Sequence, residues 1–189
     1  MVATPTKRMT EAEFRQFSLG DNTGQWELHR GELVEKSGMS VAHGGVMMRM
    51  TELLLPQLDR RVYRLRINHA RARCSADTYY IPDLAVVPTE AVLTLMERPE
   101  SLDAYPEPLP LVIEIWSPTT GRYDVMAKLP DYQARGDREI WYVHPYMRTL
   151  TVWRKQADGG YAETLYTEGI VRPASLPGVA IDLAELFEP

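Results

Sequence analysis

Two acidic residues, each set in an apolar segment, and a lysine that follows them are the residues of this sequence best suited to chemistry. Asp83 lies within 79–87 and Glu114 within 111–116, and both stretches have the composition of buried strands. An ionised carboxylate in such a strand is costly unless it is paired, hydrogen-bonded or bound to a metal. A divalent cation shared by both carboxylates is the simplest single explanation. It predicts metal-assisted hydrolysis, with a phosphodiester as the favoured substrate.

The predicted metal ligands are Asp83 and Glu114, and the predicted cation is Mg²⁺ or Mn²⁺, because hard cations prefer carboxylate oxygens. Lys128 is the favoured catalytic lysine. It lies four residues after Asp124, so both share one face of a helix expected over 121–134, just after the glutamate strand. Alone, this pair would be an ordinary surface ion pair. Beside the two carboxylates we favour a lysine that stabilises the transition state.

Three further acidic or basic residues have both a functional and a structural interpretation. Glu32 is either an additional acidic ligand or a salt-bridged residue of a hairpin. His43, near the start of a long helix, either lies beside the metal as a proton carrier or bonds a backbone group. Asp124 is a possible accessory group because of its spacing from Lys128.

Six arginines fall between positions 60 and 73. In extended segments Arg64 and Arg66 share one face, and so do Arg71 and Arg73, since side chains alternate along a strand. These four are either a phosphate-contacting strip or a charged strand edge that discourages aggregation. Both interpretations stay open at this level.

Length and composition indicate one ordinary globular domain over 1–189, with 1–9 as a flexible arm. A net charge of −5 argues against a simple sequence-independent nucleic-acid binder, although acidic residues around a metal would lower the count in a nuclease. One cysteine, Cys74, excludes an internal disulfide and a cysteine-rich zinc site. No apolar run is long enough to span a membrane, so a cytoplasmic protein is expected.

The hydrophobic pattern predicts an α+β fold, a mixed central sheet flanked by helices with additional β-hairpins. Helices are expected from Thr10, where Thr10 and Glu13 form a capping box, over 41–61, over 121–134 and over 183–187. Pro56 either kinks the second of these helices or ends a first part of it. Strands are expected at 63–68, 70–75, 79–87 and 111–116, with hairpins over 26–35 and 139–154 and a strand pair at 161–166 and 170–171. Segment 89–110 is expected to be a surface excursion with one helical turn.

Several of these motifs together resemble the Uma2 family of endonuclease-like proteins, also called the domain of unknown function 820. They are Pro82-Asp83, the run 114–120, Asp124 with Lys128, Tyr132, and the run 139–143. The hairpin 26–33, His43 and the segment 176–187 extend the similarity over nearly the whole chain.

The resemblance implies membership of the PD-(D/E)xK nuclease superfamily and its restriction-endonuclease-like fold. It implies that Asp83 and Glu114 are the metal-binding carboxylates. Our first hypothesis is therefore a metal-dependent endonuclease that cuts DNA, although the sequence does not distinguish DNA from RNA as the substrate. The superfamily lysine normally lies two residues after the glutamate, and Trp116 occupies that position here. The resemblance therefore implies that the lysine has moved to the following helix, where Lys128 is the candidate.

Two competing hypotheses remain. In the first, the fold is retained only as a catalytically inactive module that binds nucleic acid or protein. In the second, the protein is structural, and Asp83 and Glu114 merely bond backbone amides. Retention of both carboxylates disfavours a pure binder, since they would repel phosphate. A homo-oligomer, most simply a dimer, is also expected, because the aromatic-rich strands 139–144 and 149–154 offer a sheet edge.

Overall fold

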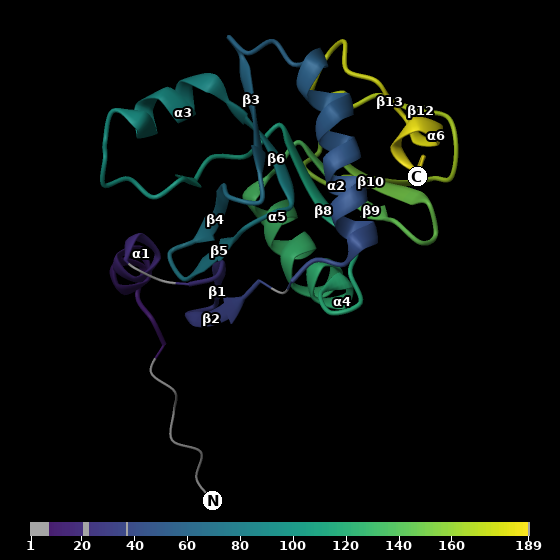
Figure 1. Ribbon diagram of the computed structural model, residues 1–189. Coiled ribbons are helices and arrows are strands. Elements are labelled where there is room, and N and C mark those ends of the chain that lie inside the picture. The colour runs from purple at the N-terminus through teal and green to yellow at the C-terminus, as the bar shows by residue number, and fades with distance from the viewer. Residues whose placement is uncertain (1–7, 21–22, 37, 189) are drawn as a thin grey trace, which may run out of the picture.

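The computed structural model describes residues 8–20, 23–36 and 38–188, and it is a mixture of helices and short strands around one central sheet (Figure 1). The helical elements are α1 (Glu11–Leu19), α2 (Val41–Leu54), the 3₁₀ turn η1 (Leu55–Gln57), α3 (Thr89–Met96), α4 (Gly121–Tyr123), the π-helical turn η2 (Asp124–Lys128), α5 (Leu129–Arg135) and α6 (Leu183–Leu186). Among the described residues, no helix has both the length and the apolar character that crossing a membrane requires.

The central sheet has six strands in the order β11-β10-β9-β8-β6-β3. Its strands are β3 (Tyr63–Ile67), β6 (Leu84–Pro88), β8 (Leu111–Ile115), β9 (Glu139–His144), β10 (Thr149–Lys155) and β11 (Tyr161–Tyr166). The pair β8–β9 is parallel and the other neighbours are antiparallel, so the sheet is mixed as expected. The strand carrying Glu114 therefore lies next to the strand that follows Asp83.

The two faces of this sheet are buried by different elements. Leu111, Ile113 and Ile115 pack on one side against α2 and the C-terminal segment 171–187. Val112 packs on the other side with Tyr132 of α5. Because side chains alternate along a strand, Glu114 shares the face of Val112 and points toward the helix that carries Lys128. Strand periodicity thus decides which helix the glutamate meets.

A second sheet carries the N-terminal hairpin and has the order β2-β1-β5-β4-β7. Its strands are β1 (Trp26–His29), β2 (Glu32–Glu35), β4 (Arg71–Ser75), β5 (Thr78–Tyr80) and β7 (Ala104–Tyr105). Helix α1 packs Phe14 against Tyr79 of this sheet, and Thr10 and Glu13 form the expected capping box. The backbone N–H of Met9 donates to Gly31 O at 2.8 Å, so the arm predicted over 1–9 is attached at this residue, while 1–7 lie outside the described residues.

Three predictions about elements are wrong. The strand over 79–87 is broken, because 81–83 leave the second sheet after β5 and enter the central sheet at β6. Segment 89–110 is not a mere surface excursion: it forms α3 and β7, and Tyr105 and Leu109 are buried. Strand β11 pairs with β10, and β12 (Ile170–Val171) pairs with β13 (Ile181–Asp182), so the expected pairing of 161–166 with 170–171 does not occur.

The long helical prediction over 41–61 is confirmed for its first part. Helix α2 ends at Leu54 and continues as η1, which contains Pro56. The edge argument for a dimer is also corrected, because β9 and β10 both lie inside the sheet and β11 forms the edge.

Candidate active site

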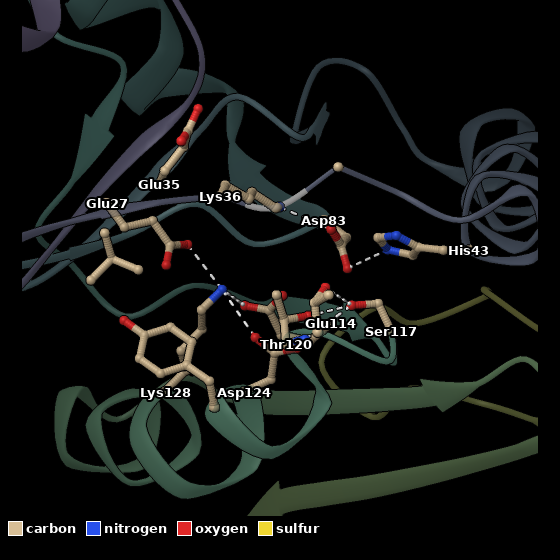
Figure 2. Close-up of a pocket in the computed structure, with 14 residues that line it drawn as sticks. Glu27, Glu35, Lys36, His43, Asp83, Glu114, Ser117, Thr120, Asp124 and Lys128 are labelled. Atoms are coloured by element: carbon tan, nitrogen blue, oxygen red, sulfur yellow. Dashed lines mark hydrogen bonds and ion pairs between the residues drawn. The ribbon is translucent and has the colours of Figure 1, made fainter.

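Buried acidic and basic side chains from both sheets converge on one cavity of about 120 Å³ (Figure 2). The walls come from the N-terminal hairpin, the start of α2, the bend before β6, the end of β8 and the helix from α4 to η2. The charged or titratable residues of the lining are Glu27, Glu35, Lys36, His43, Asp83, Glu114, Tyr123, Asp124 and Lys128. A cavity of this size holds several water molecules.

Asp83 is fixed by groups from three separate elements. Its Oδ2 accepts a hydrogen bond from the backbone N–H of Ile115 at 2.7 Å and one from His43 Nε2 at 2.9 Å. Its Oδ1 lies 2.9 Å from the Nζ atom of Lys36. No described residue gives this buried Oδ1 a hydrogen bond of normal geometry. One oxygen of Asp83 therefore has bonding capacity left for a ligand in the cavity.

Glu114 is held from the helix side. Its Oε1 accepts a hydrogen bond from the Tyr132 hydroxyl at 2.7 Å and lies 3.3 Å from Lys128 Nζ. The glutamate side chain is only 5% exposed. Both partners come from one helix, and their four-residue spacing places them on the same face.

Lys128 lies at the centre of three carboxylates. Its Nζ is 2.9 Å from Glu27 Oε1, 3.2 Å from Asp124 Oδ1 and 3.3 Å from Glu114 Oε1, and its side chain is 3% exposed. The π-helical turn η2 contains Asp124 and Lys128 at its two ends, and Leu129 N donates back to Asp124 O. Such wide turns occur mostly as single insertions in helices and frequently at functional sites.

The buried lining has more acidic than basic groups. Four carboxylates, those of Glu27, Asp83, Glu114 and Asp124, face the two ammonium groups of Lys36 and Lys128. Among the described residues that line the cavity, two negative charges are therefore left without a buried counterion when all four acids are ionised. Buried charges require compensation, and one divalent cation supplies the two positive charges that are needed.

The pKa values of the site follow from this arrangement. Burial raises the pKa of Glu114, which the charge of Lys128 opposes. Burial likewise raises the pKa of Asp124. For Lys128, burial alone would lower the pKa, but the surrounding carboxylates outweigh it and raise the pKa well above its usual value. Burial lowers the pKa of His43 despite the neighbouring Asp83, which favours a neutral imidazole.

The cavity contains several of the residues that the sequence analysis selected: Asp83, Glu114, Lys128, Asp124 and His43 all line it. Glu32 does not: it is exposed on β2, although it belongs to the same hairpin as Glu27. His43 bonds the carboxylate of Asp83 through Nε2, while its backbone N–H donates a hydrogen bond to the hydroxyl oxygen of Ser40, the N-cap of α2.

The four selected arginines lie elsewhere. Arg73 donates to both carboxylate oxygens of Glu11, at 3.0 Å each, and Arg66 pairs with Asp103. Arg71 is half-buried on β4, and Arg64 lies on β3 at the edge of the central sheet. Of the described residues, the cavity lining includes none of these four. Their contact with phosphate stays a prediction.

Sequence reasoning missed Glu27 and Lys36. Glu27 lies on β1 and is 2% exposed. Its carboxylate accepts a hydrogen bond from the Ile81 N–H at 2.7 Å and forms an ion pair with Lys128. Its signal was available, since it lies between Trp26 and Leu28 as Asp83 lies among apolar residues. Lys36 follows a strand end and has no local pattern that would mark it.

The residues present fit a hard divalent cation. Within the described part of the chain, no three Asp, Glu, His or Cys side chains converge closely enough to form a metal site by themselves. Magnesium does not need three, because it keeps several waters and is bound through one or two carboxylates. The underbonded Oδ1 of Asp83 and the charge excess of the lining suit such a cation. Asp83 and Glu114 are the residues that would hold it.

Comparison with known proteins shows which family the chain belongs to. The family model Uma2, described as "Putative restriction endonuclease", matches residues 12–184. A solved structure from Anabaena variabilis ATCC 29413, described as a putative nuclease belonging to DUF820, is 19% identical, with a TM-score of 0.70 over 95% of this chain and 97% of that chain. At this identity the likeness shows the shared fold alone. No curated protein matches. Since the family model covers the hairpin, both carboxylate strands and the helix of Lys128, the chain belongs to the Uma2 family of restriction-endonuclease-like proteins.

Proposed function

We propose that this protein is an endonuclease that depends on Mg²⁺ or Mn²⁺ and hydrolyses phosphodiester bonds in DNA. The family supports nuclease chemistry in general. The observation that carries the metal dependence is the excess of buried carboxylates over ammonium groups in a cavity with room for water. A divalent cation bound there would orient the phosphate, lower the pKa of a water and stabilise the charge of the transition state.

The protein's own residues position these components. His43 and the Ile115 N–H fix one oxygen of Asp83, which leaves the other for a ligand. Tyr132 and Lys128 fix Glu114. In the proposed reaction, the oxygen of a water forms a bond to phosphorus while one P–O bond to a sugar oxygen breaks. The leaving oxygen takes the electron pair and a proton, and the water loses one proton.

The test combines cation binding with cleavage. Titration calorimetry with Mg²⁺ and Mn²⁺ compares the wild type with Asp83→Asn and Glu114→Gln, which keep side-chain shape and remove one charge each. Glu168→Gln, on an exposed loop outside the cavity, is the control. We expect both site variants to lose cation binding and cleavage at least about 100-fold, the size expected when a group that stabilises the transition state is removed. The control should equal the wild type.

Cleavage is measured on plasmid, linear duplex, single-stranded DNA and RNA of one sequence. Cutting of DNA alone supports the DNA assignment, and cutting of RNA would correct it. A wild type that binds no cation and cuts none of these substrates would contradict the proposal and favour an inactive module that binds nucleic acid or protein. The dimer and the cytoplasmic location stay predictions. Light scattering on the same purified protein measures its oligomeric state and so tests the dimer.

A further inference from the structure

The cavity contains a second buried lysine that the family assignment does not use. Lys36 follows β2 and reaches the cavity from the hairpin, whereas Lys128 reaches it from the helix (Figure 2). The Lys36 side chain is 8% exposed, and its Nζ lies 2.9 Å from Asp83 Oδ1. It also donates a hydrogen bond to the backbone oxygen of Ile81 at 2.7 Å. A buried lysine paired with Asp83, the proposed metal ligand, needs a physical reason.

The two lysines differ in how many donors they have left. An ammonium group has three N–H donors. Lys128 Nζ has three carboxylate oxygens within 3.3 Å, as many as it has donors. Lys36 Nζ has two partners within 2.9 Å among the described residues, Asp83 Oδ1 and Ile81 O, and the contact with Ile81 is its one hydrogen bond of normal geometry there. Lys36 is thus the buried lysine with capacity to bind a new oxygen.

The charges around the two lysines also favour Lys36 over Lys128 as the residue that binds an anionic substrate. A phosphodiester is an anion, and the carboxylates of the lining repel it. Lys128 is surrounded by three of these carboxylates, so its positive charge is already compensated by them. Within the described part of the chain, Lys36 is paired with one carboxylate, that of Asp83, which is also the acid whose Oδ1 would turn to a bound cation.

We propose that Lys36 is the lysine that contacts the substrate: it leaves Asp83 Oδ1 and donates a hydrogen bond from Nζ to a non-bridging oxygen of the phosphate that is cut. Lys128 then acts as a positioning residue that holds Glu27, Glu114 and Asp124 in place. No proton changes hands in this contact, because the ammonium stays charged and donates only a hydrogen bond. The inference rests on the proposed nuclease function.

The experiment compares Lys36→Met, Lys36→Arg and the control Lys155→Met. Methionine keeps the apolar stem and removes the charge, arginine keeps a charge and donors, and Lys155 is an exposed residue at the end of β10. Thermal unfolding first shows that each variant folds. Calorimetry then measures Mn²⁺ affinity, and single-turnover assays measure cleavage.

We expect Lys36→Met to bind Mn²⁺ at least as tightly as the wild type, since a competing ammonium has been removed from Asp83, and to cut at least about 100-fold more slowly. Lys36→Arg should recover part of the rate, and Lys155→Met should match the wild type. This combination separates a substrate contact from a mere counterion, whose removal would leave the cleavage rate unchanged.

Three results overturn the inference. Cleavage by Lys36→Met at the wild-type rate shows that Lys36 does not contact the phosphate, while the nuclease function stands. Weaker Mn²⁺ binding by this variant shows that Lys36 serves to orient Asp83. A wild type that neither binds cation nor cuts removes the nuclease function, and the role of Lys36 is lost with it.

Discussion

At the scale of single residues, the site is an unequal set of buried charges. Lys128 is surrounded by three carboxylates, and Asp83 is shared by His43, Lys36 and the Ile115 N–H. Buried ion pairs of this kind gain little over apolar packing, but removal of one partner is costly because the others are left uncompensated. The arrangement therefore favours a defined geometry of the acids over maximal stability.

Removal of the central ammonium gives the residue-scale prediction. In Lys128→Met four buried carboxylates would face Lys36 alone, so we expect the free energy of unfolding to fall by about 3–5 kcal/mol without divalent cation. Urea unfolding followed by circular dichroism measures it. Lys155→Met is the matched control at an exposed site and should change the same quantity by less than about 0.5 kcal/mol. Equal stability of both variants would contradict the buried charge network.

At the scale of elements, the site depends on irregular segments between regular ones. The chain leaves β5 of one sheet and enters β6 of the other through 81–83, which places Asp83 at the boundary of the two sheets. The π-helical turn η2 likewise interrupts the helix between α4 and α5. Helix α1 lies farther away and is attached to the second sheet by the ion pair of Glu11 with Arg73.

This attachment has a pH dependence that can be measured. Hydrogen bonds from Arg73 and from Tyr79 lower the pKa of Glu11 from its ordinary 4.5. A carboxyl whose pKa is lower in the folded state stabilises that state above its unfolded pKa, and this contribution is lost as the pH falls through the folded pKa. We expect Glu11→Gln to lower the free energy of unfolding at neutral pH by at most about 1 kcal/mol, because the pair is partly exposed.

The difference between Glu11→Gln and the wild type should shrink as urea unfolding is repeated in steps below pH 4.5. In an Arg73→Met background the same substitution should have little effect, since its main partner is gone. A difference that stays constant with pH, or an undiminished effect in that background, would show that the ion pair does not attach α1.

At the scale of the whole molecule, the central sheet has a separate cover on each face. The C-terminal segment supplies much of the cover on the α2 side, with Ile181, Leu183 and Leu186 buried among the strands. Figure 1 shows this segment, in yellow and with β13 and α6 in it, beside α2. The opposite face is covered by the helix that carries Lys128 and Tyr132, and Glu114 of β8 bonds Tyr132 on that side.

A matched pair of isoleucines tests whether the C-terminal segment is part of the core. Ile181 is fully buried in β13, and Ile170, in the paired strand β12, is 54% exposed. We expect Ile181→Ala to lower the free energy of unfolding by about 2–5 kcal/mol through lost burial and a cavity. Ile170→Ala should cost less than about 0.5 kcal/mol. Similar losses in denaturant unfolding of both variants would contradict this packing.

The sequence by itself determined the local elements and the residues that stand out within them. The capping box of Thr10 with Glu13, the hairpin over 26–35 and the α+β class follow from patterns a few residues long, and the structure confirms them. The same patterns selected Asp83, Glu114 and Lys128, because a charge in an apolar strand and a lysine four residues from an aspartate are visible without a fold. Their chemical roles stay predictions.

Only the tertiary structure decided which separated segments meet. That Glu27 and Lys36 join the cavity and that 79–87 divides between two sheets both depend on pairings between distant residues. Such pairings minimise exposed apolar area and unpaired backbone over the whole molecule, so no short stretch of sequence records them. The excess of negative charge in the cavity is likewise decided by the tertiary structure alone, because it exists only once four acids from separate elements are buried together.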